Sequence, residues 1–308
     1  MMQPSLPFVS VIVPVFNQAI GLQQCLEALE NQSYPKHLYE VIVVDNGSDA
    51  EENIAGVVAQ FAQVVLAYES QPGSYAARNR GISLAKGPVI AFTDADCVPA
   101  SDWIEQGVAI LQQTSNCGLV AGQINTTFQV ADRPTAVELY ESLWYPLSQK
   151  EFVETHHFGA TANVFTRTEV LQQVGGFDST LKSNGDREWG QRVFAAGYTL
   201  HYAETVCVNH PARHSLEQLY SRARRIMGGR YDLQQKEHSF WKRNGLFMLS
   251  VTKYLTAPIA MLSFNFFLDR RLKTLKQKIQ VSWVMFFVSY VYVWEMIRLK
   301  CGSTSHRG

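Results

Sequence analysis

Phe8-Val9-Ser10-Val11-Ile12-Val13-Pro14-Val15 is the first of two apolar stretches that decide the fold, and Tyr39-Glu40-Val41-Ile42-Val43-Val44 is the second. Both are rich in β-branched residues, which is the pattern of buried strands. Between them, residues 21–31 carry apolar side chains at the spacing of one helix face. A strand, a helix and a second strand in this order predict a βαβ unit and a parallel sheet.

Acidic residues follow these strands. Asp45 comes directly after the second strand, and Asp94-Ala95-Asp96 follows a third apolar run, residues 88–93. Open α/β sheets bind ligands at the carboxyl ends of their strands, and Mg²⁺ is typically held by one or two carboxylates plus substrate phosphates. The sequence therefore predicts a metal–diphosphate site at Asp94 and Asp96, with Asp45 accepting hydrogen bonds from a ribose or a base. Ordinary turns remain the alternative for both motifs, since Asn46-Gly47 is a strong turn pair.

A third element begins at Gly73-Ser74 and is predicted to be helical to about residue 85. Its N-terminal N–H groups and dipole suit an anion, and the guanidinium of Arg78 or Arg80 could add a forked donor for phosphate. Solvated arginines on an amphipathic helix are the alternative. The first strand is not followed by Gly-x-Gly-x-x-Gly, which argues against a dinucleotide-binding fold.

In this order the motifs resemble those of the family 2 glycosyltransferases, over about residues 8–230. The resemblance implies a glycosyltransferase-A fold, which is an α/β fold with a mostly parallel, Rossmann-like central sheet. It also implies a nucleotide-sugar donor and inversion at the sugar carbon. The matching segments are Val11-Ile12-Val13-Pro14-Val15-Phe16-Asn17, Val43-Val44-Asp45-Asn46-Gly47-Ser48, Ala77-Arg78-Asn79-Arg80-Gly81, Phe92-Thr93-Asp94-Ala95-Asp96, Gly159-Ala160-Thr161-Ala162-Asn163, Val174-Gly175-Gly176-Phe177-Asp178 and Gly185-Asp186-Arg187-Glu188-Trp189-Gly190-Gln191-Arg192.

The resemblance also suggests which residues hold the donor and a metal. A divalent cation, Mn²⁺ or Mg²⁺, is expected on Asp96 and Asp94. His210 is a further candidate, because imidazole and carboxylates share transition-metal ions, although a lone histidine can equally be structural. The residues expected to bind the nucleotide sugar are Pro14, Asn17, Asp45, Arg78, Asn79 and Asp94.

Asp186 is the predicted catalytic base, because a carboxylate at the reacting centre can take the proton of an attacking hydroxyl. It begins a predicted helix, and Asp is a preferred N-cap residue, so a capping role is the alternative. The family usually has Glu-Asp where this chain has Gly185-Asp186, and Glu188 is a candidate for the missing second charge. Acceptor contacts are expected from Asn163, Glu188 and Trp189. Residues 221–225 are only a loose substitute for the basic motif of processive relatives.

The composition bears on which partners the protein binds and on the cellular compartment in which it works. Lys and Arg together number 27, as do Asp and Glu, and the zero net charge argues against nucleic acid as a partner. The five cysteines lack zinc or redox spacing, which predicts free thiols in a reducing compartment. The N-terminus has no basic stretch before its apolar run, so no signal peptide is expected. A cytoplasmic protein is predicted.

The C-terminal part contains two apolar segments. Residues 245–268 are long enough to cross a bilayer, whereas residues 281–294 are shorter than the roughly 20 residues that a spanning helix needs. If both crossed, the basic linker between them, residues 269–278, would lie outside the cell, against the positive-inside tendency. Helices lying in the cytoplasmic interface, with the basic residues at anionic headgroups, fit this pattern better. A soluble helical appendage or a dimer surface is the alternative.

The sequence therefore predicts a catalytic domain over residues 1–235 and a helical, membrane-associated tail over residues 236–308. The nucleotide-sugar half of the catalytic domain would be about residues 1–100 and the acceptor half about residues 101–235. The expected activity is transfer of a single hexosyl group to a saccharide or lipid-linked acceptor at the inner face of the membrane, in polysaccharide, cell-envelope or glycolipid synthesis.

Two other functions remain as alternatives. A nucleotidyltransferase would use similar acids, but it would need a glycine-rich, basic loop where this chain has Asn17-Gln18-Ala19-Ile20-Gly21. A catalytically inactive nucleotide-sugar-binding module would be expected to lose one of the acids, and none is missing.

Overall fold

The computed structural model describes residues 6–144, 147–237, 239–261, 269 and 271–305. The chain forms two compact units. Unit 1 consists of Met1–Thr126, Leu147–Thr180 and Asn184–Pro211, and unit 2 consists of Thr127–Pro146, Leu181–Ser183 and Ala212–Gly308. Compactness thus groups residues 212–235 with the C-terminal helices, whereas the sequence analysis groups them with the catalytic domain. The functional boundary at residue 235 stays a prediction.

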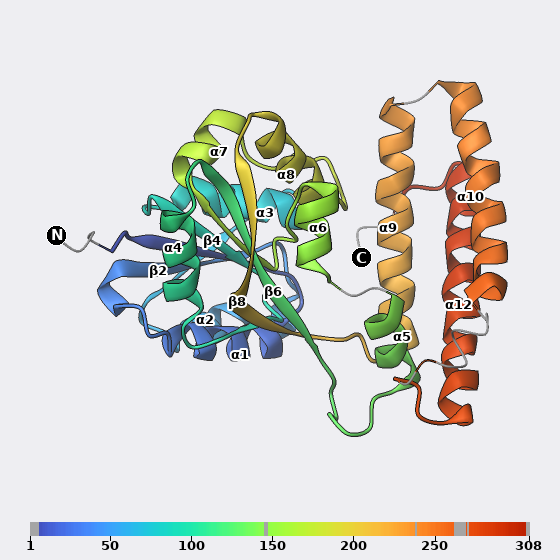
Figure 1. The fold of residues 1–308 in the computed structure, drawn as a ribbon, viewed down its shortest axis with the longest axis horizontal. Helices are drawn as coiled ribbons and strands as arrows, with labels where there is room; N and C mark the ends of the chain where they lie inside the picture. Colours follow the sequence, from blue (N-terminus) through green and yellow to red (C-terminus); the bar gives the residue numbers. More distant parts are fainter. Residues whose placement is uncertain (1–5, 145–146, 238, 262–268, 270, 306–308) are drawn as a thin grey trace. The chain divides into compact units, whose positions relative to one another are not determined.

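Unit 1 is an α/β structure around one sheet, whose described strands lie in the order β3-β2-β1-β4-β7-β6-β8-β5 (Figure 1). Strands β3, β2, β1 and β4 run parallel to one another. Strand β7 runs antiparallel to β4 and to β6, and β5 runs antiparallel to β8. The strands are β1 (Val9–Val15), β2 (Tyr39–Asp45), β3 (Val64–Tyr68), β4 (Val89–Thr93), β5 (Val98–Pro99), β6 (Cys117–Thr127), β7 (Asn163–Arg167) and β8 (Thr199–Pro211).

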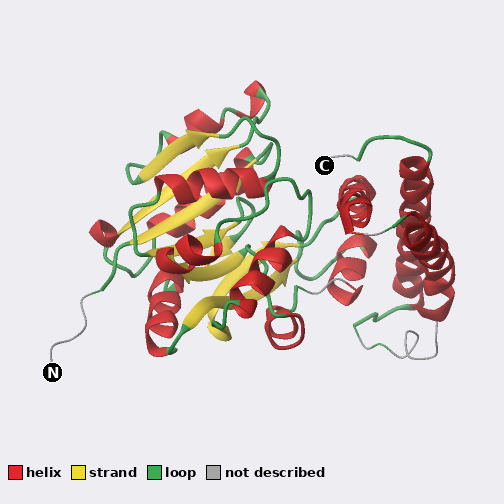
Figure 2. Ribbon diagram, turned by 90° about the horizontal axis from the view of Figure 1, so that it is seen from above, coloured by secondary structure: helices red, strands yellow, loops and turns green. Residues whose placement is uncertain are grey.

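Helices cover both faces of the sheet, as Figure 2 shows. Side chains at alternate positions of a strand point to opposite faces. Val9, Val11 and Val13 of β1 join the core under α1 and α4, whereas Ile42 and Val44 of β2 pack against Ala77 of α3 on the other face. The helices of unit 1 are α1 (Ala19–Glu30), α2 (Ile54–Val58), α3 (Ser74–Leu84), α4 (Trp103–Gln113), α6 (Gln149–His156), α7 (Thr168–Val174) and α8 (Gly185–Ala195).

The strand order places the ligand-binding edge. The chain passes from β1 outward to β2 and β3 and then returns to add β4 on the other side of β1. This reversal makes a topological switch point between β1 and β4, and ligands bind outside the carboxyl ends of the strands at such points. Asn17 follows β1, and Asp94 follows β4. The predicted βαβ unit and its parallel strands are therefore confirmed, with the acids at the binding edge.

Unit 2 is helical. It contains α5 (Ala136–Trp144), α9 (Leu216–Glu237), α10 (Phe240–Met261) and α12 (Leu275–Lys300), which share a core of buried apolar side chains. Glu295 of α12 is fully buried and forms ion pairs with Arg224 and Arg298. Burying a carboxylate is costly unless it is paired, so these arginines satisfy the charge inside the helical core.

The structure corrects two features of the predicted tail. Residues 281–294, which the sequence analysis takes as too short to span a membrane, belong to the 26-residue helix α12. Lys276 and Lys278 of the predicted linker lie in the first turns of that helix. Among the described residues, α12 is the helix whose length and hydropathy would allow it to cross a bilayer. Within the first apolar segment, α10 ends at Met261, and residues 262–268 lie outside the described residues.

Candidate functional site

Asp45 and Asn17 lie in neighbouring loops at the carboxyl edge of the sheet. The Asp45 carboxylate accepts a hydrogen bond from the Ser48 N–H at 2.9 Å. The Asn17 side chain donates to Asp49 Oδ2 and accepts from the Asp49 N–H, both at 2.8 Å. Asp45 therefore accepts a hydrogen bond within a turn, as expected if Asp45-Asn46-Gly47-Ser48 is an ordinary turn. The two hydrogen bonds between Asn17 and Asp49 hold the loop after β1 to the loop after β2, and Pro14 is half-buried in β1.

Asp94 is held by an arginine from α3. The Arg78 guanidinium is 4% exposed and forms a short ion pair with Asp94. Its carbon also lies 5.7 Å from the centre of the Tyr75 ring. Arg78 is therefore not a solvated arginine on a helix surface. Arg80 is exposed on the same helix. A donor phosphate near Asp94 would meet a positive charge that the fold has already fixed in place.

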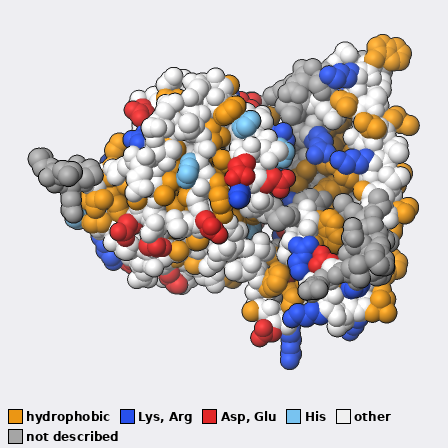
Figure 3. Space-filling view, in the orientation of Figure 1, with side chains coloured by type: hydrophobic (Ala, Val, Ile, Leu, Met, Phe, Trp, Pro, Cys, Tyr) orange, Lys and Arg blue, Asp and Glu red, His pale blue; other side chains and the backbone are white. Residues whose placement is uncertain are grey.

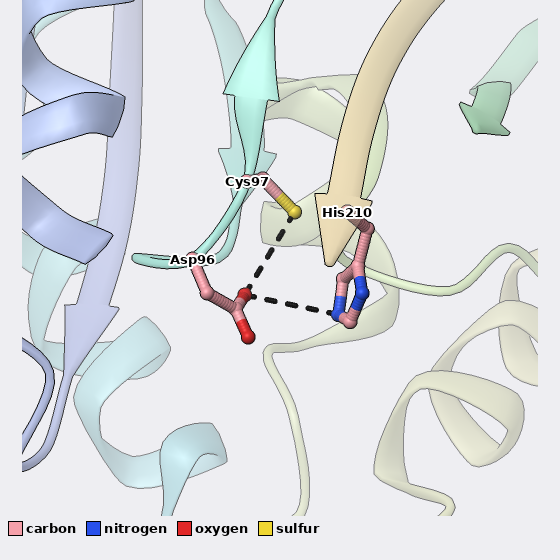
Figure 4. A group of neighbouring side chains, drawn as sticks. All are labelled: Asp96, Cys97 and His210. Carbon is pink, nitrogen blue, oxygen red and sulfur yellow. Dashed lines mark hydrogen bonds and ion pairs between the residues drawn. The ribbon is translucent and has the colours of Figure 1, made fainter. Parts of the chain in front are cut away.

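Asp96 meets His210 because β5 pairs with β8. Val98 lies opposite Asn209 in this antiparallel ladder, which brings the residues just before β5 beside the end of β8. Asp96 Oδ1 lies 3.7 Å from His210 Nε2 (Figure 4). With the thiol of Cys97 they form a group of ligand atoms that lie within 4.8 Å of one another. Asp94 is not in this group and pairs with Arg78, so its role as a metal ligand beside Asp96 stays a prediction.

The chemistry of Asp96 and His210 fits a cation. His210 Nδ1 lies 2.9 Å from the Pro211 carbonyl oxygen. A carbonyl only accepts, so Nδ1 donates its proton there, and in the neutral imidazole Nε2 then presents its lone pair to the Asp96 carboxylate. Metal-binding histidines commonly donate their other N–H to such a carbonyl. Two acceptors facing each other at this separation are stabilised by a positive ion between them.

Cys97 is a poor ligand despite its position. Burial, with Asp94 and Asp96 adding to the effect, raises the pKa of its thiol well above the usual value. The thiolate is the form that binds metals, and Mg²⁺ and Mn²⁺ prefer oxygen ligands. Asp96 and His210 are therefore the two residues of this group that suit a divalent cation.

Asp186 lies in the first turn of α8, next to the start of α3. The Tyr75 hydroxyl lies 3.4 Å from Asp186 Oδ1. Burial raises the pKa of the Asp186 carboxyl, while the nearby Arg78 charge and the Arg187 N–H oppose that rise. A carboxylate with a raised pKa is a better proton acceptor, which suits a general base. The N-cap of α8 is Asn184, so the alternative that Asp186 caps the helix is wrong.

Three other predicted site residues have partners within the fold, and their roles toward a ligand stay predictions. Asn79 exchanges two hydrogen bonds with the backbone of Phe177, at 2.7 and 2.9 Å, and so holds a turn. Trp189 is fully buried, and its indole N–H donates to the Gly175 carbonyl. Glu188 pairs both carboxylate oxygens with Arg192, at 2.6 and 3.0 Å.

Asn163, the third predicted acceptor residue, is also fully buried. Its side-chain oxygen accepts from the Trp103 indole N–H at 2.8 Å, and its amide donates to the carbonyls of Gln123 and Val206 at 2.9 and 2.8 Å. All of its side-chain groups are thus used inside unit 1. Asn163 joins α4, β6 and β8, and its contact with an acceptor stays a prediction.

Asn163→Ala should lower the free energy of unfolding by at least about 3 kcal/mol, because it leaves the Trp103 donor and two buried carbonyls unpaired at roughly 1–3 kcal/mol each. Urea unfolding measures this. Asn125→Ala, at an exposed position of the same strand β6, is the control and should change stability by less than about 0.5 kcal/mol. An Asn163→Ala protein of normal stability with a raised KM for acceptor would support the predicted acceptor role.

The arginines of residues 221–225 are engaged within unit 2. Arg222 lies 3.3 Å from Glu141, and Arg224 lies 3.4 Å from the buried Glu295. These pairings give both arginines a structural role in the helical core. The sequence offered no signal for this, because the glutamates lie about 70–80 residues away in the chain.

Tyr75 is the site residue that sequence reasoning did not single out. It lies in the first turn of α3, before the segment of residues 77–81 that resembles the family. The one signal available was an aromatic residue among the small residues Ser74, Ala76 and Ala77. Its contact with Asp186 depends on how α3 and α8 pack, which the sequence pattern does not specify.

Comparisons with known proteins match residues 10–175 to the family model "Glycosyl transferase family 2". The protein named Glycosyltransferase AglE of Haloferax volcanii is 41% identical over 217 residues, which cover 69% of each chain. The Pre-mycofactocin glycosyltransferase of Mycobacterium tuberculosis is 29% identical over 226 residues, which cover 71% of this chain and 46% of that protein.

Among solved structures, the mannosyltransferase PcManGT of Pyrobaculum calidifontis, in complex with GDP-Man and Mn²⁺, has a TM-score of 0.63 and 18% identity. The match covers 95% of this chain and 88% of that one. At this identity the likeness bears on the fold alone, and it confirms the predicted glycosyltransferase-A type of architecture.

Proposed function

The chain belongs to glycosyltransferase family 2, and on that basis we propose that it moves a single hexosyl group from a nucleotide-diphosphate sugar to an acceptor hydroxyl, with inversion at the sugar carbon. The observation that carries this proposal is the gathering of Asp45, Asp94, Asp96 and Asp186 around the switch point of the sheet. Asp186 is half-buried, its pKa is raised, and it lies in the first turn of α8, as suits a general base.

In this mechanism Asp186 accepts the proton of the acceptor hydroxyl as that oxygen attacks the sugar carbon. Asp45 accepts hydrogen bonds from the nucleoside, and the Arg78–Asp94 pair lies beside the diphosphate. Asp96 and His210 would hold a divalent cation, and their mixture of carboxylate and imidazole favours Mn²⁺ over Mg²⁺. When bound, such a cation stabilises the charge that develops on a leaving diphosphate. The GDP-Man and Mn²⁺ in the complex of PcManGT support this pairing of ligands.

A panel of donors tests the function. UDP-, GDP- and TDP-sugars would each be incubated with the full chain and Mn²⁺, and release of the nucleoside diphosphate would be measured with and without saccharide and lipid-linked acceptors. Turnover of one donor class is expected. Release of pyrophosphate from a nucleoside triphosphate and sugar phosphate would instead identify a nucleotidyltransferase. Tight donor binding without turnover under any condition would identify an inactive binding module.

The surface of unit 2 supports a lipid-linked acceptor at an anionic membrane. Helices α10 and α12 pack on each other through their buried faces, and both carry exposed apolar side chains, which belong to the hydrophobic surface of unit 2 in Figure 3. On α12 they lie at three- and four-residue steps, which is the spacing of one helix face. The exposed residues are Trp241, Met248, Leu249, Leu255 and Ile259 on α10, and Leu275, Ile279, Trp283, Phe286, Tyr290, Trp294 and Ile297 on α12.

The charge distribution points the same way. Residues 212–308 contain 17 Lys and Arg against 5 Asp and Glu, whereas residues 1–211 contain 10 against 22. The zero net charge of the chain therefore hides a strongly basic helical unit, which suits anionic headgroups. We assign this surface to the cytoplasmic face of a membrane, where a lipid-linked acceptor would be concentrated for transfer.

Vesicle co-sedimentation tests the membrane contact. The full chain should bind vesicles that contain phosphatidylglycerol more strongly than neutral ones, and less strongly at high salt. Replacing Trp283 and Trp294 together by Ser should weaken binding at least about 10-fold, because each buried aromatic ring contributes roughly 1.5–3 kcal/mol. Tyr68→Ser removes an exposed aromatic residue of unit 1 and should change nothing. If the wild-type protein, the double Trp variant and Tyr68→Ser bound the vesicles equally, the proposed membrane contact would be wrong.

A further inference from the structure

Tyr75 presents its hydroxyl to the catalytic carboxylate. The Tyr75 oxygen lies 3.4 Å from Asp186 Oδ1, which is long for a hydroxyl hydrogen bond but typical of catalytic contacts that shorten when substrate binds. Burial and the Asp186 charge raise the pKa of the Tyr75 hydroxyl. The hydroxyl therefore stays protonated at neutral pH and can donate to the carboxylate.

The Tyr75 ring is fixed from several sides. Only 6% of the residue is exposed. The ring stacks on Phe177 with 5.8 Å between the ring centres and 27° between the planes, and the Arg78 guanidinium lies 5.7 Å from its centre. A ring held in this way delivers its hydroxyl to a single place, which is what positioning a base requires.

The glycine before Asp186 fits this ring. A Cβ on Gly185 would lie 2.6 Å from Tyr75 Cε2 and 2.8 Å from Cδ2 and Cζ, closer than real side chains approach. The backbone does not require glycine here, because Gly185 is not among the residues with positive φ. The Tyr75 ring therefore occupies the space that a side chain at position 185 would fill, and the two residues form a matched pair.

We propose that Tyr75 is a positioning residue for Asp186: its hydroxyl donates to the carboxylate, and Gly185 is retained so that the ring can reach it. This inference rests on the proposed role of Asp186 as the base. The charged and titratable groups that face Asp186 are Tyr75 and Arg78 from α3 and Asp94 after β4, so Tyr75 is the neutral donor among them.

Tyr75→Phe isolates the hydroxyl, since the ring, its stacking and its contact with Gly185 are kept. We expect kcat to fall roughly 10-fold, as for loss of a hydrogen bond to a charged group, with the donor KM unchanged. The acidic limb of the pH profile of kcat/KM should move to higher pH, because a carboxylate that loses a donor has a higher pKa. Tyr39→Phe is the control. It removes another buried hydroxyl, which donates to the Leu29 carbonyl, and should leave kcat and the pH profile unchanged.

The pairing of ring and glycine has a test that needs no turnover. Gly185→Ala should lower the thermal midpoint clearly in the wild-type background and much less in a Tyr75→Ala background, because the smaller residue removes the clash. Equal losses in the two backgrounds would overturn the matched pair. They would also show that the ring does not depend on glycine at this position.

The outcomes separate this inference from the proposed function. If Asp186→Asn transfers sugar normally, the base assignment fails and the role of Tyr75 fails with it. If Asp186→Asn is inactive while Tyr75→Phe matches Tyr39→Phe in kcat and in pH profile, the base assignment survives and Tyr75 is a packing residue only.

Discussion

Replacing Asp186 by Asn should lower sugar transfer about 10²–10⁴-fold, the usual contribution of a general base, and leave donor binding nearly unchanged. The amide keeps the shape of the carboxylate but cannot take the proton of the acceptor. Asp186 is not a member of the Asp96–Cys97–His210 group, so binding of the metal and the donor should persist. Steady-state transfer and calorimetric donor binding measure the two effects. Asp132→Asn, the same change at an exposed position, is the control.

The pH dependence gives a second test of Asp186. Its folded-state pKa is raised by burial, so kcat/KM should rise with pH as the carboxyl deprotonates and becomes a base. Folding stability has the opposite slope. The contribution of this carboxyl is fully present below its unfolded pKa of about 3.9 and is lost as pH rises through the higher folded pKa.

Asp186→Asn should therefore be more stable than the wild-type protein at neutral pH, and the difference should vanish in acid. Urea unfolding at several pH values measures it. An Asn variant that is inactive and also less stable at pH 7 would indicate that Asp186 holds the structure together rather than serving chemistry.

Asp96→Ala should weaken Mn²⁺-dependent donor binding by about 100-fold or more. Loss of a group that merely orients a ligand typically costs 10–100-fold in metal affinity, and Asp96 would be a ligand itself. His210→Ala should act in the same direction, since Nε2 faces the Asp96 carboxylate. Titration of Mn²⁺ at fixed donor concentration measures both.

Cys97→Ala is the matched control for this group. The thiol belongs to the same group as Asp96, but Mn²⁺ prefers oxygen and nitrogen ligands to sulfur. Its removal should leave the Mn²⁺ dependence unchanged. A loss equal to that of Asp96→Ala would make Cys97 a ligand and would point to a softer metal than Mn²⁺.

The central strands β1, β2 and β4 could be predicted, because each is buried on both sides and its sequence is mostly apolar. The edge that carries Asp45 and Asp94 follows from the same pattern. The meeting of Asp96 with His210 could not be predicted, because it depends on the pairing of the two-residue strand β5 with β8. A strand this short has no periodicity to detect.

The roles of polar and aromatic residues in the motifs were harder to predict than the strands. Asn79, Asn163 and Trp189 stand in motifs of the family, but each bonds to partners between 14 and 98 residues away. A residue that bonds within the fold and a residue that binds substrate can be of the same polar or aromatic type. The sequence alone therefore does not tell the two roles apart. Only the partner distinguishes them, and the partner is set by packing.

The interleaving of the two units has a consequence for making chimeras. The chain passes between the units five times, at residues 126–127, 146–147, 180–181, 183–184 and 211–212. Grafting the C-terminal helices of a relative onto residues 1–211 would retain α5 as a foreign part of the new helical core, including Glu141 without its native arginines Arg213 and Arg222. The smallest exchangeable module therefore includes residues 127–146 together with residues 212–308, and acceptor specificity would be transplanted only by moving both.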